Sequence, residues 1–222
     1  MNSTLALQDL TLDELREQIA PRLAGHAAFD GWNVSAVDSV ARDLGVDIDV
    51  ARLAMAGRPV DLIDAWVQSV DRAMASSCPA ERLATMKIRE RIRVLVLARL
   101  ELVAADREAL RRALTVLSLP TNLSRAARIG WRSADVMWRL AGDISADYNH
   151  YTKRAMLASI YSATLLVFVN DESADFGDTR AFLERRIDNV MQIEKAKAGL
   201  LARSQNRPSL SRFIGRLRYP AQ

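Results

Sequence analysis

The strongest constraint on this chain is the spacing of its apolar residues, which recur every three or four positions along almost the whole length. Half of the 222 residues are apolar, whereas only 9 are glycine and 6 are proline. Alternation of β-branched and polar residues, which a strand would show, is nearly absent. The sequence therefore predicts an all-α fold with enough apolar surface to bury a core.

Turn residues divide this pattern into about ten helices. Gly45 and Gly57 end the two shortest helices, and Pro120 and the stretch 171–177 interrupt later ones. The predicted helices cover 5–23, 35–44, 47–55, 60–75, 80–102, 106–117, 123–142, 147–170, 178–202 and 208–218.

The order of these helices predicts three parts. A helix-turn-helix-like unit of three small helices with its connector (1–76) precedes a larger helical bundle (77–203) and a short basic tail (204–222). This layout is similar to that of TetR-type repressors. It predicts an all-α, TetR-like helical bundle with a vestigial N-terminal helix-turn-helix and a C-terminal amphipathic helix, although topology does not fix function.

The second helix of the helix-turn-helix outline is poorly suited to DNA. A recognition helix presents Arg, Lys, Asn or Gln to base edges and positive charge to phosphates. Here Asp47 and Asp49 occupy its N-terminal end, and Arg52 is the one residue that could help. We expect a structural unit that binds no nucleic acid. A TetR-type transcriptional regulator that senses a lipid is the alternative interpretation.

The sequence offers no set of residues for catalysis. A di-iron bundle needs Glu-x-x-His motifs on two helices, but the chain has only His26 and His150, and the half-motif from Asp147 to His150 has no counterpart. Glycine-rich phosphate loops, nucleophile elbows and Cys/His zinc spacings are absent. The single cysteine, Cys78, cannot form an internal disulfide. We expect a non-catalytic protein without cofactor or metal.

Charge is distributed unevenly. The net charge of +4 hides a C-terminal segment in which no acidic residue follows Glu194. Seven cations lie there, at Lys195, Lys197, Arg203, Arg207, Arg212, Arg216 and Arg218. The remaining 24 basic and 27 acidic residues give 1–194 a net charge of −3. An anionic partner is therefore expected to meet the C-terminal segment.

The end of that segment has the pattern of an interfacial helix. Its apolar residues follow i, i+3, i+4 and i+7 spacing, and its arginines lie off that stripe. The predicted membrane-binding residues are Leu210, Arg212, Phe213, Ile214, Arg216, Leu217 and Arg218. Each cation near an anionic leaflet contributes on the order of 1 kcal/mol. The alternatives are a helix that docks on its own bundle and a tail that binds nucleic acid.

The start of the chain and its longest apolar run bear on its location. Residues 1–19 carry four acidic residues, unlike a secretory signal or a transit peptide. The apolar run 156–169 is shorter than the roughly 20 residues that cross a bilayer. These features predict a bacterial cytoplasmic protein that is peripheral on the inner membrane.

A long motif in the second half of the chain carries a family resemblance. Asp135 is followed three residues later by Trp138, then by Gly142-Asp143 and by the run Tyr-Thr-Lys-Arg at 151–154. Similar segments are 31–32, 161–164, 171–173 and 178–187. The chain resembles the accessory lipid-binding family of ubiquinone (coenzyme Q) biosynthesis, the ninth member of the Coq set, which has a TetR-like fold.

The resemblance implies a homodimer that binds an isoprenoid quinone or a phospholipid in an apolar pocket of the bundle. It also implies a terminal helix that reaches an anionic membrane surface. The implied protein partner is a di-iron demethoxyubiquinone hydroxylase, to which such a protein presents substrate without being the catalyst.

Asp135 and Trp138 match the family's surface patch for the hydroxylase, whereas Arg139 departs from it, because relatives often have an aromatic residue there. On the residues alone, Trp138 could equally belong to the core. The charged residues around the same turn could form a structural ion-pair network; they are Asp143, Asp147, Lys153 and Arg154, together with Tyr151.

Bulky and adaptable apolar residues on the helix over 147–170 and on its neighbour are candidates for the pocket wall. The predicted lipid-binding residues are Trp131, Met137, Met156, Ile160, Tyr161, Leu165 and Phe168. Core packing is the alternative for each, because a core wall and a pocket wall have the same composition. The run 161–169 could equally form a dimer face.

Overall fold

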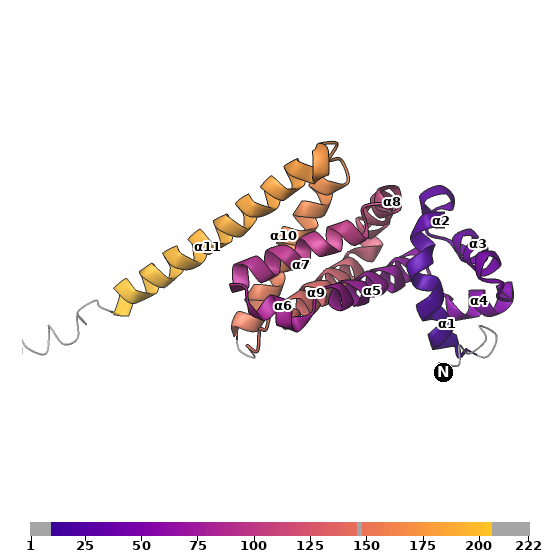
Figure 1. Cartoon of the computed structure of the whole chain (residues 1–222), viewed down its shortest axis with the longest axis horizontal. Helices are drawn as coiled ribbons and strands as arrows, with labels where there is room; N and C mark the ends of the chain where they lie inside the picture. The colour runs from indigo at the N-terminus through magenta and orange to yellow at the C-terminus, as the bar shows by residue number, and fades with distance from the viewer. Residues whose placement is uncertain (1–9, 146–147, 206–222) are drawn as a thin grey trace, which may run out of the picture. The chain divides into compact units, whose positions relative to one another are not determined.

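The computed structural model describes residues 10–145 and 148–205, with the backbone alone for Tyr148, Met191 and 193–205. Within those ranges every regular element is helical (Figure 1). This confirms the all-α prediction. The predicted helix over 208–218 lies outside the described residues.

The helices follow one another with short connections. They are α1 (Leu12–Ile19), α2 (Leu23–Asp30), α3 (Val34–Leu44), α4 (Ile48–Ala54), α5 (Pro59–Ser77), α6 (Ala80–Ala84), α7 (Ile88–Leu102), α8 (Arg107–Leu117), α9 (Leu123–Leu140), α10 (Tyr148–Phe168) and α11 (Gly177–Gln205). The 3₁₀ helices η2 (Ala20–Arg22), η3 (Pro120–Asn122) and η4 (Ala174–Phe176) precede α2, α9 and α11. The chain divides into two compact units, 1–183 and 184–222, and the sites described below belong to the first.

The predicted first helix, 5–23, covers α1 and η2 among the described residues, whereas α2, from Leu23 to Asp30, was not predicted. The Thr11 hydroxyl accepts a hydrogen bond from the Glu14 N–H (3.3 Å), and the Glu14 carboxylate accepts one from the Thr11 N–H (2.8 Å), which caps the start of α1. Pro21 then lies in η2. Because proline has no N–H and its ring crowds the preceding turn, the α-helical ladder is interrupted before α2 begins.

Side-chain caps begin both helices of the helix-turn-helix pair, α3 and α4. The Asn33 side chain accepts from the N–H of Ser35 (2.8 Å), and the Asp47 side chain accepts from that of Asp49 (2.9 Å). Gly45 ends α3 in the left-handed region at φ 65°, which glycine adopts at little cost. Both ends of each helix lie within one residue of the range predicted from the sequence.

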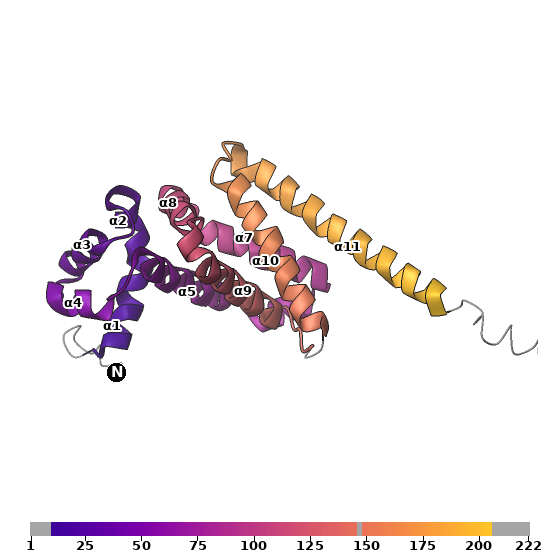
Figure 2. The ribbon, with the colours of Figure 1, turned by 180° about the vertical axis from the view of Figure 1, so that it is seen from behind.

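Trp32 attaches the N-terminal helices to the bundle. Its indole N–H donates to the Ala109 carbonyl in α8 (3.0 Å), and its ring packs on that of Trp66 in α5, with centroids 5.1 Å apart. From this junction α5 runs into the bundle and packs against α7 and α9 (Figure 1). The reverse view shows α9 between α5 and α10 (Figure 2).

The predicted helix over 80–102 is also divided, into α6 and α7. The Arg91 guanidinium donates to the carbonyl oxygens of Ala84 (3.1 Å) and Met86 (2.9 Å), which lie where α6 ends. A long side chain thus satisfies carbonyl groups that the helix leaves without an internal partner. Spacing of apolar residues alone does not reveal such a break.

Candidate functional site

A cavity of about 270 Å³ lies inside the first compact unit, bordered by α5, α7, α8, α9 and α10. Its buried apolar wall includes Ile63, Trp66, Val70, Leu110, Ile129 and Leu165. Leu166, which is 60% exposed, and the exposed Ser118 and Ser162 also border it, so the cavity opens to the surface at this end. An apolar wall with one open end suits an oily ligand.

The volume limits how much of a ligand the cavity holds. Small-molecule pockets usually span roughly 300–1,000 Å³, and this cavity lies just below that range. A ring or a short hydrocarbon segment fits inside. The rest of a longer chain would extend past Leu166.

Four side chains from four helices form a buried polar cluster beside the cavity; they are Asp71, Arg99, Ser133 and Tyr161. Arg99, 2% exposed, pairs with the Asp71 carboxylate and donates from Nε to the Tyr161 hydroxyl oxygen (2.8 Å). The Ser133 hydroxyl donates to the other Asp71 oxygen (3.1 Å). Of the four, Arg99, Ser133 and Tyr161 border the cavity directly. The mainly apolar wall therefore has one buried polar region.

The surroundings fix the charges of this cluster. Burial opposes the charge of Arg99, but Tyr161 and Asp71 outweigh it, so the pKa of Arg99 is raised. Burial raises the pKa of Tyr161, although Arg99 partly offsets that effect. The cluster therefore presents a charged guanidinium and a neutral phenol at physiological pH.

A series of ion pairs joins α5 to α9 next to the cavity. Arg132 contacts Asp64 (2.5 Å), and Arg125 contacts both Asp64 (3.0 Å) and Asp61 (2.9 Å). Arg132 also lies 3.8 Å from Asp71. Three carboxylates of α5 thus meet two arginines of α9 and Arg99 of α7, so the group carries no net charge.

Two of the seven predicted lipid-binding residues border the cavity, namely Tyr161 and Leu165. The other five, which are not among its bordering residues, are Trp131, Met137, Met156, Ile160 and Phe168. On α10, residues 161, 162, 165 and 166 face the cavity, because positions one turn apart share a face of a helix. The structure thus brings two of the seven predicted residues to this cavity, and lipid binding by any of the seven stays a prediction.

Three of the residues that do not border the cavity pack elsewhere. Met137 is fully buried in the core. The Phe168 ring packs on that of Phe176, with centroids 4.8 Å apart, and Trp131 packs on Tyr151 at 6.0 Å. For Met137 and Phe168 the core-packing alternative is the one that the structure shows.

Sequence reasoning missed the contributions of α5, α7 and α8 to the cavity. One signal was present: Arg99 follows Leu95 and Val96 on the buried face of α7. A cation in an apolar stripe needs a buried partner, and Asp71 occupies a similar position on α5. Their pairing across 28 positions is not visible in local spacing.

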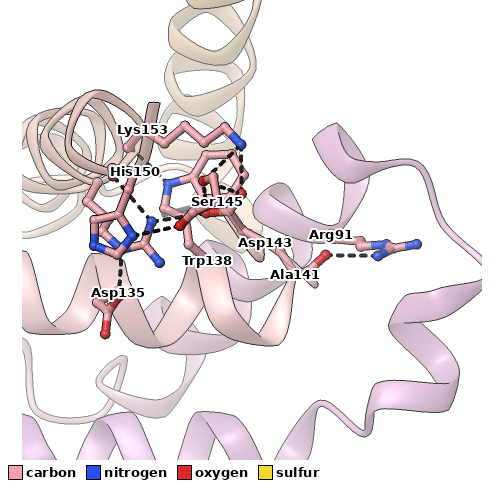
Figure 3. A network of polar contacts seen from close by, with 9 residues as sticks. Arg91, Asp135, Trp138, Ala141, Asp143, Ser145, His150 and Lys153 are labelled. Atoms are coloured by element: carbon pink, nitrogen blue, oxygen red, sulfur yellow. Dashed lines mark hydrogen bonds and ion pairs between the residues drawn. The ribbon is translucent and has the colours of Figure 1, made fainter. Parts of the chain in front are cut away.

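A second group, the interhelix cluster, joins α9 to α10 and consists of Asp135, Asp143, Ser145, Lys153 and Arg154 (Figure 3). The Arg154 side chain, 2% exposed, donates to Asp135 (2.5 Å) and Asp143 (3.0 Å). Lys153 donates to the other Asp143 oxygen (2.6 Å). Burial alone would raise the pKa of Asp143, but hydrogen bonds from Lys153, Ser145 and Arg154 hold it well below its usual range. The predicted ion-pair network exists for Asp143, Lys153 and Arg154; Asp147 lies outside the described residues.

The predicted partner-binding residues lie in this cluster or next to it. Asp135 is occupied on both oxygens, by Arg154 (2.5 Å) and by Arg139 (2.8 Å). Trp138 is half-buried, and its indole N–H donates to the Lys153 carbonyl (2.9 Å). Arg139 is 73% exposed. Arg139 and one side of Trp138 are therefore accessible, whereas Asp135 mainly orients arginines.

Two further predictions concern Arg52 in the helix-turn-helix and the membrane-binding tail. Arg52 of α4 is engaged by Asp38 (2.8 Å), which reduces its availability to a phosphate or base. The predicted membrane-binding residues 210–218 lie outside the described residues. Among the helices that the structure describes, none is long and apolar enough to cross a membrane.

Comparison with known proteins places these features in context. A family model described as COQ9 matches residues 123–194. The "Ubiquinone biosynthesis protein COQ9, mitochondrial" of Homo sapiens is 32% identical over 189 residues, which cover 82% of this chain and 59% of that protein. The Rattus norvegicus protein of the same name is 32% identical over 192 residues, covering 81% and 61%. The chain thus spans about three fifths of the length of these relatives.

The structural comparison confirms the TetR-like fold. A crystal structure of a TetR transcriptional regulator from Nitrosomonas europaea superposes with a TM-score of 0.62 and 23% identity, covering 79% of this chain and 97% of that one. At this identity the likeness concerns the fold alone.

The predicted location is wrong. The human, rat, Bos taurus and Schizosaccharomyces pombe relatives are all named mitochondrial, which conflicts with a bacterial cytoplasmic protein on an inner membrane. The prediction rested on acidic residues near the start and on a short apolar run, and such local composition does not identify a compartment.

Proposed function

Because the chain belongs to the COQ9 family, we propose that it is a non-catalytic, lipid-binding accessory protein of ubiquinone biosynthesis. In this proposal the cavity holds the apolar part of an isoprenoid quinone intermediate or of a phospholipid. The observation that carries the proposal is the apolar cavity of about 270 Å³ with an open end at Leu166. Filling such a void with hydrocarbon restores dispersion contacts that its wall otherwise lacks.

Native mass spectrometry of the purified full chain tests this proposal. We expect an adduct whose mass, after extraction into organic solvent, corresponds to a quinone intermediate or a phospholipid. A chain that is free of lipid and that takes up no quinone analogue would contradict the proposal.

We further propose that the accessible surface at Trp138 and Arg139, oriented by Asp135, contacts a di-iron demethoxyubiquinone hydroxylase, to which the chain presents its substrate. Exposed Arg and Trp are frequent anchors of protein interfaces. Arg139→Glu should weaken capture of the purified hydroxylase. The matched control is Arg128→Glu, because Arg128 is also an exposed arginine of α9. Equal capture by both variants would exclude this surface.

The basic tail is proposed to bring the chain to an anionic membrane surface. Seven cations and no acidic residue follow Glu194, and an apolar stripe runs through 210–217. A chain lacking 207–222 should no longer co-float with anionic liposomes. Flotation equal to that of the full chain would show that another surface binds the membrane.

A homodimer completes the proposal. Leu166 of α10 leaves an apolar side chain exposed within the run 161–169, which was one candidate for a dimer face. Sedimentation equilibrium should give twice the chain mass. A monomer at micromolar concentration would refute it.

A further inference from the structure

The cavity has a polar inner region whose hydrogen-bonding capacity is unevenly used. The Ser133 hydroxyl already donates its hydrogen to Asp71, and Arg99 donates to Asp71 and to Tyr161. The Tyr161 hydroxyl oxygen accepts from Arg99, but its own hydrogen has no acceptor among the residues that the structure describes. A buried hydroxyl usually satisfies both roles. Tyr161 therefore brings an available donor to the cavity wall.

The environment strengthens this donor. Tyr161 is 7% exposed, and its oxygen accepts from a guanidinium that is itself 2% exposed. A hydroxyl that accepts a hydrogen bond from a cation is polarised and becomes a better donor. In a mainly apolar cavity such a donor discriminates between ligands that carry an acceptor and ligands that do not.

The charges around Tyr161 do not favour an anion. Arg99 is paired with Asp71, which lies directly behind the cavity wall. A further cation beside this cluster, Arg132, is paired with Asp64 (2.5 Å) and also lies 3.8 Å from Asp71. A carboxylate or phosphate placed here would lose its hydration and gain no unpaired cation.

We propose that the Tyr161 hydroxyl donates a hydrogen bond to an uncharged oxygen acceptor at the inner end of the bound lipid. This inference rests on the proposed function, and it assigns the ligand class: an apolar molecule with a carbonyl or quinone oxygen enters with that oxygen first. A free fatty acid or the phosphate of a phospholipid does not occupy the inner end. Tyr161 and the Asp71–Arg99 pair together determine this selectivity.

Three probes with the same tail test the proposal on the full chain: decylbenzoquinone, decylbenzene and decylbenzoate. We expect the unaltered chain to bind the quinone about three- to tenfold more tightly than the hydrocarbon, in the range of one hydrogen bond, and the carboxylate least tightly. This ranking needs no substitution, so it tests the proposal even if a variant fails to fold. Equal affinity for quinone and hydrocarbon, or a preference for the carboxylate, would overturn it.

Tyr161→Phe then identifies the donor. The variant should bind the quinone no more tightly than decylbenzene, while its affinity for decylbenzene stays that of the unaltered chain. Tyr151→Phe is the matched control, because Tyr151 is 62% exposed and does not border the cavity. Loss of affinity for both probes in a folded Tyr161→Phe chain would make Tyr161 a packing residue only. If the unaltered chain binds none of the probes, the proposed function itself fails.

Discussion

Two nearly inaccessible arginines hold different parts of the bundle. Arg154 and Arg99 are each 2% exposed, and each pairs with a carboxylate from another helix. Arg154 lies between two carboxylates of the interhelix cluster, whereas Arg99 lies between one carboxylate and a phenol that borders a cavity. Buried charge alone thus indicates structure. Buried charge beside a void, with a donor left over, indicates a ligand site.

The largest effect on stability should follow from removing the buried cation of the interhelix cluster. Arg154→Leu leaves Asp135 and Asp143 without their shared cation, so we expect a loss of about 3–5 kcal/mol in the free energy of unfolding, measured by urea titration. Arg139→Leu is the control, because Arg139 pairs with the same Asp135 but is 73% exposed, and it should cost less than about 1 kcal/mol. Similar losses in the two variants would mean that the burial of Arg154 adds nothing to its contribution to stability.

A double substitution tests whether Asp71 and Arg99 act as one structural pair. Arg99→Leu alone should cost about 3–5 kcal/mol, because it leaves the buried Asp71 with only Ser133 and the more distant Arg132 beside it. In the chain with both Arg99→Leu and Asp71→Leu, most of that loss should be recovered, since an apolar pair replaces an ion pair. Urea titration of the two single variants and the double variant gives the interaction free energy between Arg99 and Asp71. Additive losses would show that the pair is not an isolated structural unit.

The recovered double variant also tests function. It should fold with near-normal stability yet lose the preference for the quinone over decylbenzene, because the Tyr161 hydroxyl would no longer be polarised or held. A preference equal to that of the unaltered chain would show that the pair serves stability alone.

A smaller effect concerns stability at acidic pH. The pKa of Asp143 is lowered in the folded chain, so its contribution to stability is complete above the unfolded value of about 3.9 and is lost as pH falls toward the folded value. Below about pH 4 the unaltered chain should therefore lose stability more steeply than Asp143→Asn. Asp49→Asn, at a side chain that is 89% exposed, should leave the slope unchanged. Thermal melts across this pH range would reveal identical slopes if Asp143 were not the group responsible.

Much of the fold could be predicted because it depends on local signals. Apolar spacing predicted most of the helices, and Gly45 marked the end of α3, whose two limits lie within one residue of the predicted range. The breaks at Pro21 and after Ala84 were missed, since one depends on a ring within an otherwise continuous pattern and the other on Arg91 reaching back to carbonyl groups.

The site could be predicted only in part. Tyr161 and Leu165 were identified because they lie on the apolar helix α10, but the opposite wall comes from α5, α7 and α8. Periodicity shows which face of a helix is buried. It does not show where two buried faces fail to meet and leave a void, nor that Asp71 and Arg99 meet beside it.

Gly130 offers the most direct test that the cavity is the lipid site. It lies on α9 at the cavity wall, and a Cβ added there would meet nothing within 4 Å, so leucine can extend into the void. Gly25→Leu is the matched control, because Gly25 is an exposed helical glycine with the same free space and lies away from the cavity. In a fluorescence titration with decylbenzoquinone, the account predicts that Gly130→Leu raises Kd at least about tenfold while Gly25→Leu leaves it unchanged. The same Kd for both variants and the unaltered chain would contradict it.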